Sequence, residues 1–253
     1  MSYYIILLFF FISSIECLEK INLKTFERSI YSQNGEDGVI TKIFEYLLPT
    51  NFTAVEFGAG DGFKYSNTAN LLNSGWKRIG FEGLVTANNS DIFQEFITPE
   101  NINDVFAKYD IPYDLDFLSI DVDLNDFYLW ATLKYRPKVV VVEYNNSYGL
   151  DDKIVSLEMQ GVWDYTDYQS ASLVNMCKLA EIKGYTLIHT TGGFNAFFLR
   201  TDLLNTLDIT FENQGDYYMH NIKVKNFYRP SNKKTITFEE ALQSLAQKNL
   251  TIQ

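Results

Sequence analysis

Short apolar runs of strand length alternate along the chain with segments whose apolar residues recur at helical spacing. The helical period is clear in Asp37–Leu47. Two further predicted helices, Ser66–Ser74 and Ser170–Lys183, are each followed by a glycine that would end them. The predicted strands are 53–57, 78–81, 92–97, 116–120, 138–143, 185–189 and 196–200. This alternation predicts an α/β fold with a doubly wound, mostly parallel seven-stranded sheet, helices on both of its faces and a late hairpin-like pair of strands.

The first two predicted strands end in glycines and acids. Gly58, Gly60 and Gly62 stand at every second position after the first strand. That strand carries Glu56, and the second strand ends in Glu82. In open parallel sheets, ligands bind beyond the carboxyl ends of the strands, and a turn rich in glycine lets backbone N–H groups approach a ligand closely. We therefore predict that these five residues bind a cofactor.

The spacing of the glycines distinguishes between two classes of cofactor. The Rossmann dinucleotide fingerprint, G-x-G-x-x-G, would need a glycine where this chain has Phe63. The observed E-x-G-x-G-x-G spacing instead resembles motif I of the methyltransferases that use S-adenosylmethionine (SAM). In that interpretation Glu82 accepts hydrogen bonds from both ribose hydroxyls of SAM. Glu56 faces the amino end of the cofactor or holds the glycine turn in place.

A second group of acids follows the predicted strand 116–120. Asp121, Asp123 and Asp126 lie close together in the sequence and would repel one another unless a cation, a donor or water screens them. Mg²⁺ prefers oxygen ligands, which Asp121 would supply together with Glu143 and Asn145 from the end of the next strand. Alternatively, Asp123 and Asp126 cap the helix that follows.

Composition bounds the domain organisation and the partners. The chain has 253 residues, of which 46% are hydrophobic and 16% aromatic, enough to bury the core of a single domain. We assign 18–253 to that domain and 201–253, within it, to a C-terminal extension. The formal net charge of −11 predicts that nucleic acid is not a partner, because phosphate binding requires a basic face.

The N-terminus has the character of a targeting segment. Tyr3–Ile12 is an unbroken apolar run, too short for a typical membrane span. Residues 1–17 therefore predict a signal peptide, and with it the secretory pathway, either secretion or the ER/Golgi lumen. No Lys or Arg precedes the run, and Ile15 and Cys17 form a poor cleavage site. An uncleaved segment would instead anchor the protein in a membrane.

Seven motifs in a fixed order suggest a family. They are 31–38 (YSQNGEDG), 55–62 (VEFGAGDG), 66–68 (SNT), 75–76 (GW), 116–123 (DFLSIDVD), 142–145 (VEYN) and 195–198 (NAFF). Together they resemble the FkbM-type methyltransferase family over most of the chain. The resemblance implies a class I SAM-dependent fold and O-methylation of hydroxyls on sugars or polyketides. It matches Glu56, Gly58, Gly60 and Glu82 to the cofactor side, and Asp121 and Asp123 to the acidic strand end.

The chain departs from this family in two places. Relatives carry glycine at the position of Leu124, so a leucine there is strained, or the loop is rebuilt, if the position needs a positive φ. A crossover between parallel strands usually needs a dozen or more residues. If the third strand lies near Ile92–Ile97, only about nine residues follow Glu82 before it, which predicts a trimmed crossover and a weakened adenine pocket.

Three functions are compatible with the sequence. The first is a SAM-dependent O-methyltransferase that acts on a glycan or a small hydroxylated acceptor, with Asp121 or Asp123 as catalytic base or metal ligand. The second is a secreted or luminal protein that keeps the methyltransferase-like fold as a non-catalytic binding module. The third is a metal-dependent glycosyltransferase, suggested by the D-x-D pattern of Asp121 and Asp123.

Overall fold

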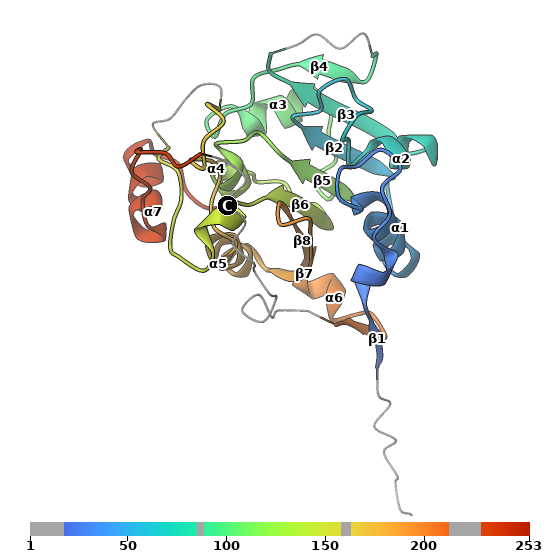
Figure 1. Ribbon diagram of the computed structural model, residues 1–253. Helices are drawn as coiled ribbons and strands as arrows, with labels where there is room; N and C mark the ends of the chain where they lie inside the picture. The colour runs from blue at the N-terminus through green and yellow to red at the C-terminus, as the bar shows by residue number, and fades with distance from the viewer. Residues whose placement is uncertain (1–17, 85–88, 158–162, 213–228) are drawn as a thin grey trace, which may run out of the picture.

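A seven-stranded sheet forms the centre of the computed structural model, which describes residues 18–84, 89–157, 163–212 and 229–253 (Figure 1). Its strands are β2 (Thr53–Phe57), β3 (Lys77–Glu82), β4 (Ile92–Gln94), β5 (Phe117–Ile120), β6 (Val139–Glu143), β7 (Tyr185–Thr191) and β8 (Asn195–Arg200). Their order across the sheet is β4-β3-β2-β5-β6-β8-β7. Only β8 runs against its neighbours, so the predicted mostly parallel sheet is confirmed and is a mixed one.

Both faces of the sheet are covered by helices. Every residue of β2 and β6 is buried, as expected for strands that pack on both sides. Alternate residues face opposite ways: Val55 and Phe57 join one hydrophobic cluster and Ala54 joins the other. One face packs against α3 (Ile102–Lys108), α4 (Asp126–Thr132), α5 (Leu173–Lys183) and α7 (Phe238–Gln247). The opposite face packs against α1 (Glu36–Tyr46), α2 (Ala69–Asn73) and α6 (Thr201–Leu204).

The helix predicted to begin at Ser66 begins three residues later, at Ala69. The Ser66 hydroxyl accepts hydrogen bonds from the backbone N–H groups of Thr68 and Ala69. Residues 66–68 therefore form a turn ahead of the helix, and this turn is used by the site described below.

The connection between β3 and β4 is short. β4 starts at Ile92, so residues 83–91 make the whole crossover, and the part of it that the structure describes contains no helix. Arg78 on β3 forms an ion pair with Asp91, whose carbonyl accepts a hydrogen bond from Gly80. These contacts hold β4 beside β3, which confirms the trimmed crossover and shows that a parallel pair forms despite it.

The two ends of the described chain pack onto the central domain. β1 (Glu19–Ile21) pairs in parallel with β9 (Ile209–Phe211). On α7, Phe238 contacts Phe127 with ring centroids 5.7 Å apart, so part of the 201–253 segment belongs to the main hydrophobic cluster. The predicted signal segment, residues 1–17, lies outside the described residues. Within the described ranges no helix combines the length and the apolar character needed to cross a membrane.

A buried carboxylate fixes the start of the sheet. Asp116, immediately before β5, accepts hydrogen bonds from the backbone N–H groups of Thr50, Asn51 and Phe52 and forms a 2.8 Å ion pair with Lys138. Burial alone would raise the pKa of Asp116, but Lys138 and the backbone donors outweigh it and hold the pKa below its ordinary value. One side chain thus joins the strands β2, β5 and β6 at their amino ends.

We predict that Asp116→Ala lowers the free energy of unfolding by roughly 3–5 kcal/mol, because Lys138 is left buried and unpaired. Urea denaturation followed by circular dichroism measures this. The matched control is Asp208→Ala at an exposed position, which should change stability by less than about 0.5 kcal/mol. Equal effects of the two substitutions would contradict the structural role of Asp116.

Candidate functional site

One cavity of about 390 Å³ opens at the carboxyl ends of β2, β3 and β5, within the usual size range of small-molecule sites. Its walls are formed by residues 57–60, 64–66, 81–84, 95–97 and 121–125, together with Gln33 and Trp163. Five of the residues predicted from the sequence line it: Gly58, Gly60, Glu82, Asp121 and Asp123. The other four, Glu56, Gly62, Glu143 and Asn145, lie outside its lining.

The glycine turn brings β2 against the end of β5. Gly58 has φ of 70°, and a Cβ added there would lie 1.9 Å from the carbonyl oxygen of Asp121. Gly60 also has a positive φ, of 51°, but a Cβ there would meet no atom within 4 Å. The first glycine is therefore required by the packing of two backbones, whereas the second leaves open a place at the cavity wall.

Gly62 does not contact the cavity. Its carbonyl accepts a hydrogen bond from the guanidinium of Arg78, which is also paired with Asp91 ahead of β4. Gly62 thus connects the turn to β3 and β4, and its role in binding a cofactor stays a prediction.

Glu82 both holds the glycine turn by hydrogen bonds and lines the cavity. One carboxylate oxygen accepts a 3.0 Å hydrogen bond from the N–H of Gly60, and the other accepts a 3.1 Å bond from the N–H of Leu84. The side chain nevertheless lines the cavity. Each carboxylate oxygen has more than one lone pair, so both can accept a further bond from a ligand.

Glu56 supports the site from beneath. Its carboxylate accepts hydrogen bonds from the hydroxyls of Ser66 and Thr68 and from the N–H of Asn67, at 2.5–2.7 Å. Burial raises the pKa of Glu56, and these donors partly offset the rise. Of the two roles expected of Glu56, these contacts favour a positioning one, because Glu56 fixes the turn 66–68, whose first residue lines the cavity.

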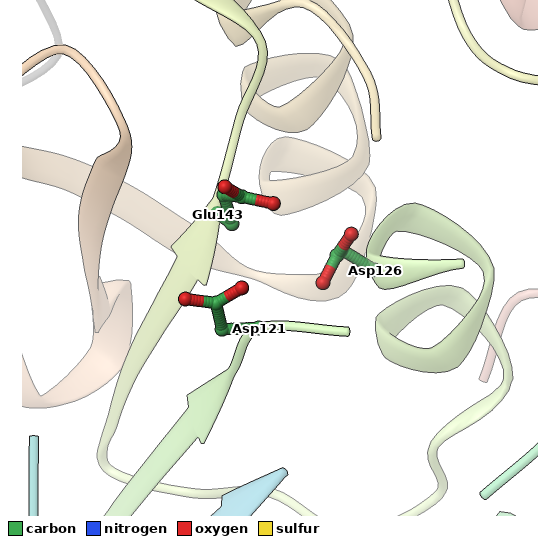
Figure 2. Close-up of side chains that lie close together, drawn as sticks. All are labelled: Asp121, Asp126 and Glu143. Atoms are coloured by element: carbon green, nitrogen blue, oxygen red, sulfur yellow. The ribbon is translucent and has the colours of Figure 1, made fainter. Parts of the chain in front are cut away.

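Three carboxylates meet beside the cavity. Figure 2 shows Asp121 from the end of β5, Asp126 from the start of α4 and Glu143 from the end of β6 pointing toward one another. One oxygen from each lies within 4.8 Å of the others. Asp121 opens on the cavity, whereas Asp126 and Glu143 are buried behind it. Oδ2 of Asp126 and Oε2 of Glu143 have no hydrogen-bond partner.

The surroundings of these three carboxyls disfavour a full negative charge on each of them at the same time. Desolvation by the surrounding protein is the largest cause that raises the pKa of each carboxyl, bringing that of Asp126 to about 7, and it acts on Asp121 even though this residue is exposed at the cavity. Repulsion between the neighbouring carboxylates raises the pKa values of Asp121 and Glu143 further. The ion pairs in the described part of the chain include no lysine or arginine bonded to any of the three.

Asp123 is not one of the three grouped carboxylates, although its charge also raises the pKa of each of them. It lines the cavity, and burial together with the charge of Glu82 raises its pKa. Its φ is 67°, and the N–H of Leu124 bonds to the carbonyl of Val122 across it. The condition for strain at Leu124, a positive φ at that position, is not met, because the left-handed residue of this loop is Asp123.

The Asn145 side chain is bonded to groups other than the carboxylates. Its amide nitrogen donates to the carbonyls of Asp167 and Gln169, and its oxygen accepts from the N–H of Ser147 at 2.9 Å. Of the predicted ligand set, Asp121 and Glu143 are brought together, and Asp126 joins them, while the ligand role of Asn145 stays a prediction. The predicted capping is corrected, since Asn125 holds the N-cap position and Asp126 is the first helical residue.

The segment after β4 supplies a wall that sequence reasoning missed. Glu95, Phe96 and Ile97 line the cavity beside Glu82. The Phe96 ring packs on Gly83, where a Cβ would lie 2.9 Å from a ring atom, and 49% of the residue remains exposed. Phe96 falls inside the predicted strand 92–97, and the available signal was that this strand could end earlier, as β4 does at Gln94. The segment after the short crossover therefore contributes to the cavity wall, whereas the weakening of an adenine pocket stays a prediction.

A pair of glycine substitutions tests the geometry of the turn. We predict that Gly58→Ala lowers the free energy of unfolding by roughly 2–5 kcal/mol, from steric overlap with Asp121 added to the left-handed backbone. Gly60→Ala should cost only about 1–2 kcal/mol, since the backbone alone opposes it. Chemical denaturation of both variants measures the difference, and equal losses would contradict the close approach at Gly58.

Comparison with known proteins leaves the family open. No family model matches the chain, and no curated protein matches it. Among solved structures, a Lactococcus lactis protein assigned as a hemolysin aligns with a TM-score of 0.42 and 15% identity over 68% of this chain and 90% of its own. The N-terminal domain of EvdMO1, solved with SAH bound, aligns with a TM-score of 0.41 and 12% identity over 66% and 80%. At these scores neither likeness supports an argument about fold or function.

Proposed function

We propose that the protein is a SAM-dependent O-methyltransferase that acts on a hydroxyl of a glycan or of a small hydroxylated acceptor. The observation that carries this proposal is the shared cavity of the glycine turn at Gly58–Gly60, Glu82 and Phe96. The sheet order supports it. From β2 the chain adds β3 and β4 on one side and then crosses to add β5 and β6 on the other, and β8 is the single antiparallel strand of the seven. This order matches the class I methyltransferase sheet that the sequence motifs implied.

The residues of the cavity fit a nucleoside cofactor. Glu82 has lone pairs free for two ribose hydroxyls, and its bonds to Gly60 and Leu84 fix where it stands. The exposed ring of Phe96 offers an apolar face of the kind that stacks on a flat base. At Gly60 a side chain would stand at the cavity wall, where a ligand needs the space.

SAM, when bound, supplies an activated methyl group. Its transfer to a hydroxyl is an in-line displacement, so the protein has to align the acceptor and remove one proton from it. Asp121 and Asp123 line the cavity and are the residues we propose for proton removal. The Mg²⁺ expected from the sequence would require the ligand set that includes Asp126, which is argued separately below.

The remaining walls are suited to the acceptor. Trp163 and Tyr65 line the cavity together with Lys64. The Trp163 ring is held by a hydrogen bond from Nε1 to the carbonyl of Thr166 and by a contact with Tyr165, 5.0 Å between centroids. Aromatic faces of this kind are suited to sugar rings and flat ring substrates. A glycan or other hydroxylated ring is therefore the acceptor class we propose.

The location of the protein is proposed from the sequence alone. Residues 1–17 have the length and apolar character of a signal segment, which favours the secretory pathway, with membrane attachment only if the segment stays uncleaved. Methyl transfer in that compartment would require SAM to be imported into it.

Calorimetric titration of the full chain with SAM, in the presence of a chelator, tests the proposal. We predict saturable binding of SAM and of its demethylated product at one site. Glu82→Ala should weaken binding by about 1–3 kcal/mol, because a charged hydrogen-bond acceptor is lost. Glu95→Gln is the matched control: Glu95 also borders the cavity, but its carboxylate is bonded to Lys108 and Tyr109, so binding should be unchanged.

Gly60→Ala provides an independent variant, since its added methyl group would enter the cavity wall without touching other protein atoms. It should weaken SAM binding while the protein stays folded. Absence of heat with both SAM and its product would contradict the proposed function.

The short crossover between β3 and β4 favours one alternative, a methyltransferase-like binding protein without turnover. Transfer of a radiolabelled methyl group from SAM to a panel of glycans distinguishes the two. Binding of SAM without transfer to any acceptor in the panel would favour the alternative.

A further inference from the structure

The carboxylates of Asp121, Asp126 and Glu143 form a group in which two buried oxygens have no hydrogen-bond donor. Asp126 is fully buried and Glu143 is 7% exposed, yet Oδ2 of the first and Oε2 of the second have no hydrogen-bond partner. A buried carboxylate oxygen without a donor is unfavourable by several kcal/mol unless something else neutralises it. Two such oxygens, in a group of three carboxylates that offer ligand atoms within 4.8 Å of one another, indicate a positively charged occupant (Figure 2).

We propose that Asp121, Asp126 and Glu143 bind a hard divalent cation at the floor of the cavity. Oxygens that share one ion lie no further apart than twice the metal–oxygen distance, about 4.1 Å for Mg²⁺ and about 5 Å for Ca²⁺. One oxygen from each of the three residues lies within 4.8 Å of the others, which fits such an ion with little or no movement. Three carboxylates are also the ligand chemistry that hard cations prefer over soft ones.

The three ligands are held by separate parts of the fold. Asp121 ends β5 and Glu143 lies at the end of β6, and these strands are neighbours in the sheet. Asp126 is fixed by a 2.7 Å hydrogen bond from the N–H of Val122 to its Oδ1, which leaves Oδ2 free. Sheet and helix thus fix the ligands before a cation binds, so little ordering is needed on binding.

Asp121 gives the ion a route to solvent. Asp126 and Glu143 are buried, but Asp121 lines the cavity and is solvent-accessible through it. An ion held by all three would therefore be reachable from the cavity, with coordination positions left for water or for an acceptor hydroxyl. The binding of the ion does not depend on the proposed methyl transfer. Only a direct contact between the ion and an acceptor hydroxyl would depend on the proposed methyltransferase function.

Titration of the metal-free full chain with Mn²⁺, monitored by the paramagnetic resonance signal of the free ion and without SAM present, tests the proposal. We expect one saturable site. Glu143→Gln removes one ligand charge with almost no change in shape, and should weaken Mn²⁺ binding at least tenfold. The melting temperature of the wild type should rise on addition of Mn²⁺, and that of the variant should not.

Asp123→Asn is the matched control. Asp123 belongs to the same acidic loop and lines the same cavity, but it is not one of the three grouped carboxylates. Its loss should weaken Mn²⁺ binding clearly less than the loss of Glu143 does, because Asp123 acts on the ion through its charge alone and not as a ligand. Equal weakening by the two substitutions would reveal a diffuse acidic surface and overturn the proposal.

The competing explanation is that protons, without a metal, neutralise the group. In that case Mn²⁺ would show no saturable binding, and an infrared band of a protonated carboxylic acid would disappear in Glu143→Gln. That pair of results would also overturn the proposal. Because this titration contains no SAM and the SAM titration contains a chelator, failure of one proposal is distinguishable from failure of the other.

Discussion

The contact between Gly58 and the carbonyl of Asp121 is the constraint on which the site depends. There is no room for a Cβ at Gly58, which allows the turn after β2 to lie directly against the end of β5. The glycine turn and the acidic loop are thereby brought to one cavity. Glu82 adds the third element, since its bond to the N–H of Gly60 fixes the turn relative to β3. Each of these contacts involves the backbone of the turn, so its path is determined without any ligand.

A second layer of buried carboxylates supports this arrangement. Glu56 bonds only to the turn at residues 66–68. In the motif at 31–38, Glu36 accepts hydrogen bonds from the side chains of Thr191 and Asn195, and thus joins α1 to the hairpin of β7 and β8. Asp37 accepts three backbone N–H bonds from residues 30–32. Glu36, Asp37 and Glu56, three acids of the sequence motifs, therefore stabilise the fold around the cavity.

The sheet and the location of the site could be predicted from the sequence because both follow from local pattern. Apolar runs such as 139–142 mark buried strands, and ligands bind at the ends of such strands. Which side chain turns inward depends on packing that no local pattern encodes. Asn145 was expected to be a ligand, but neighbouring carbonyls bind its amide, while Asp126 reaches Glu143 from a helix that the sequence associated with capping. Phe96 was missed because β4 ends at Gln94, earlier than its apolar residues suggested.

The central claim is that the cavity between the glycine turn, Glu82 and Phe96 holds a nucleoside cofactor. A crystal structure of the full chain grown with the demethylated product of SAM tests it most directly. We expect ribose hydroxyls within hydrogen-bond distance of both carboxylate oxygens of Glu82 and a base beside the Phe96 ring. A product molecule bound elsewhere, or a cavity that stays empty at saturating product, would contradict it.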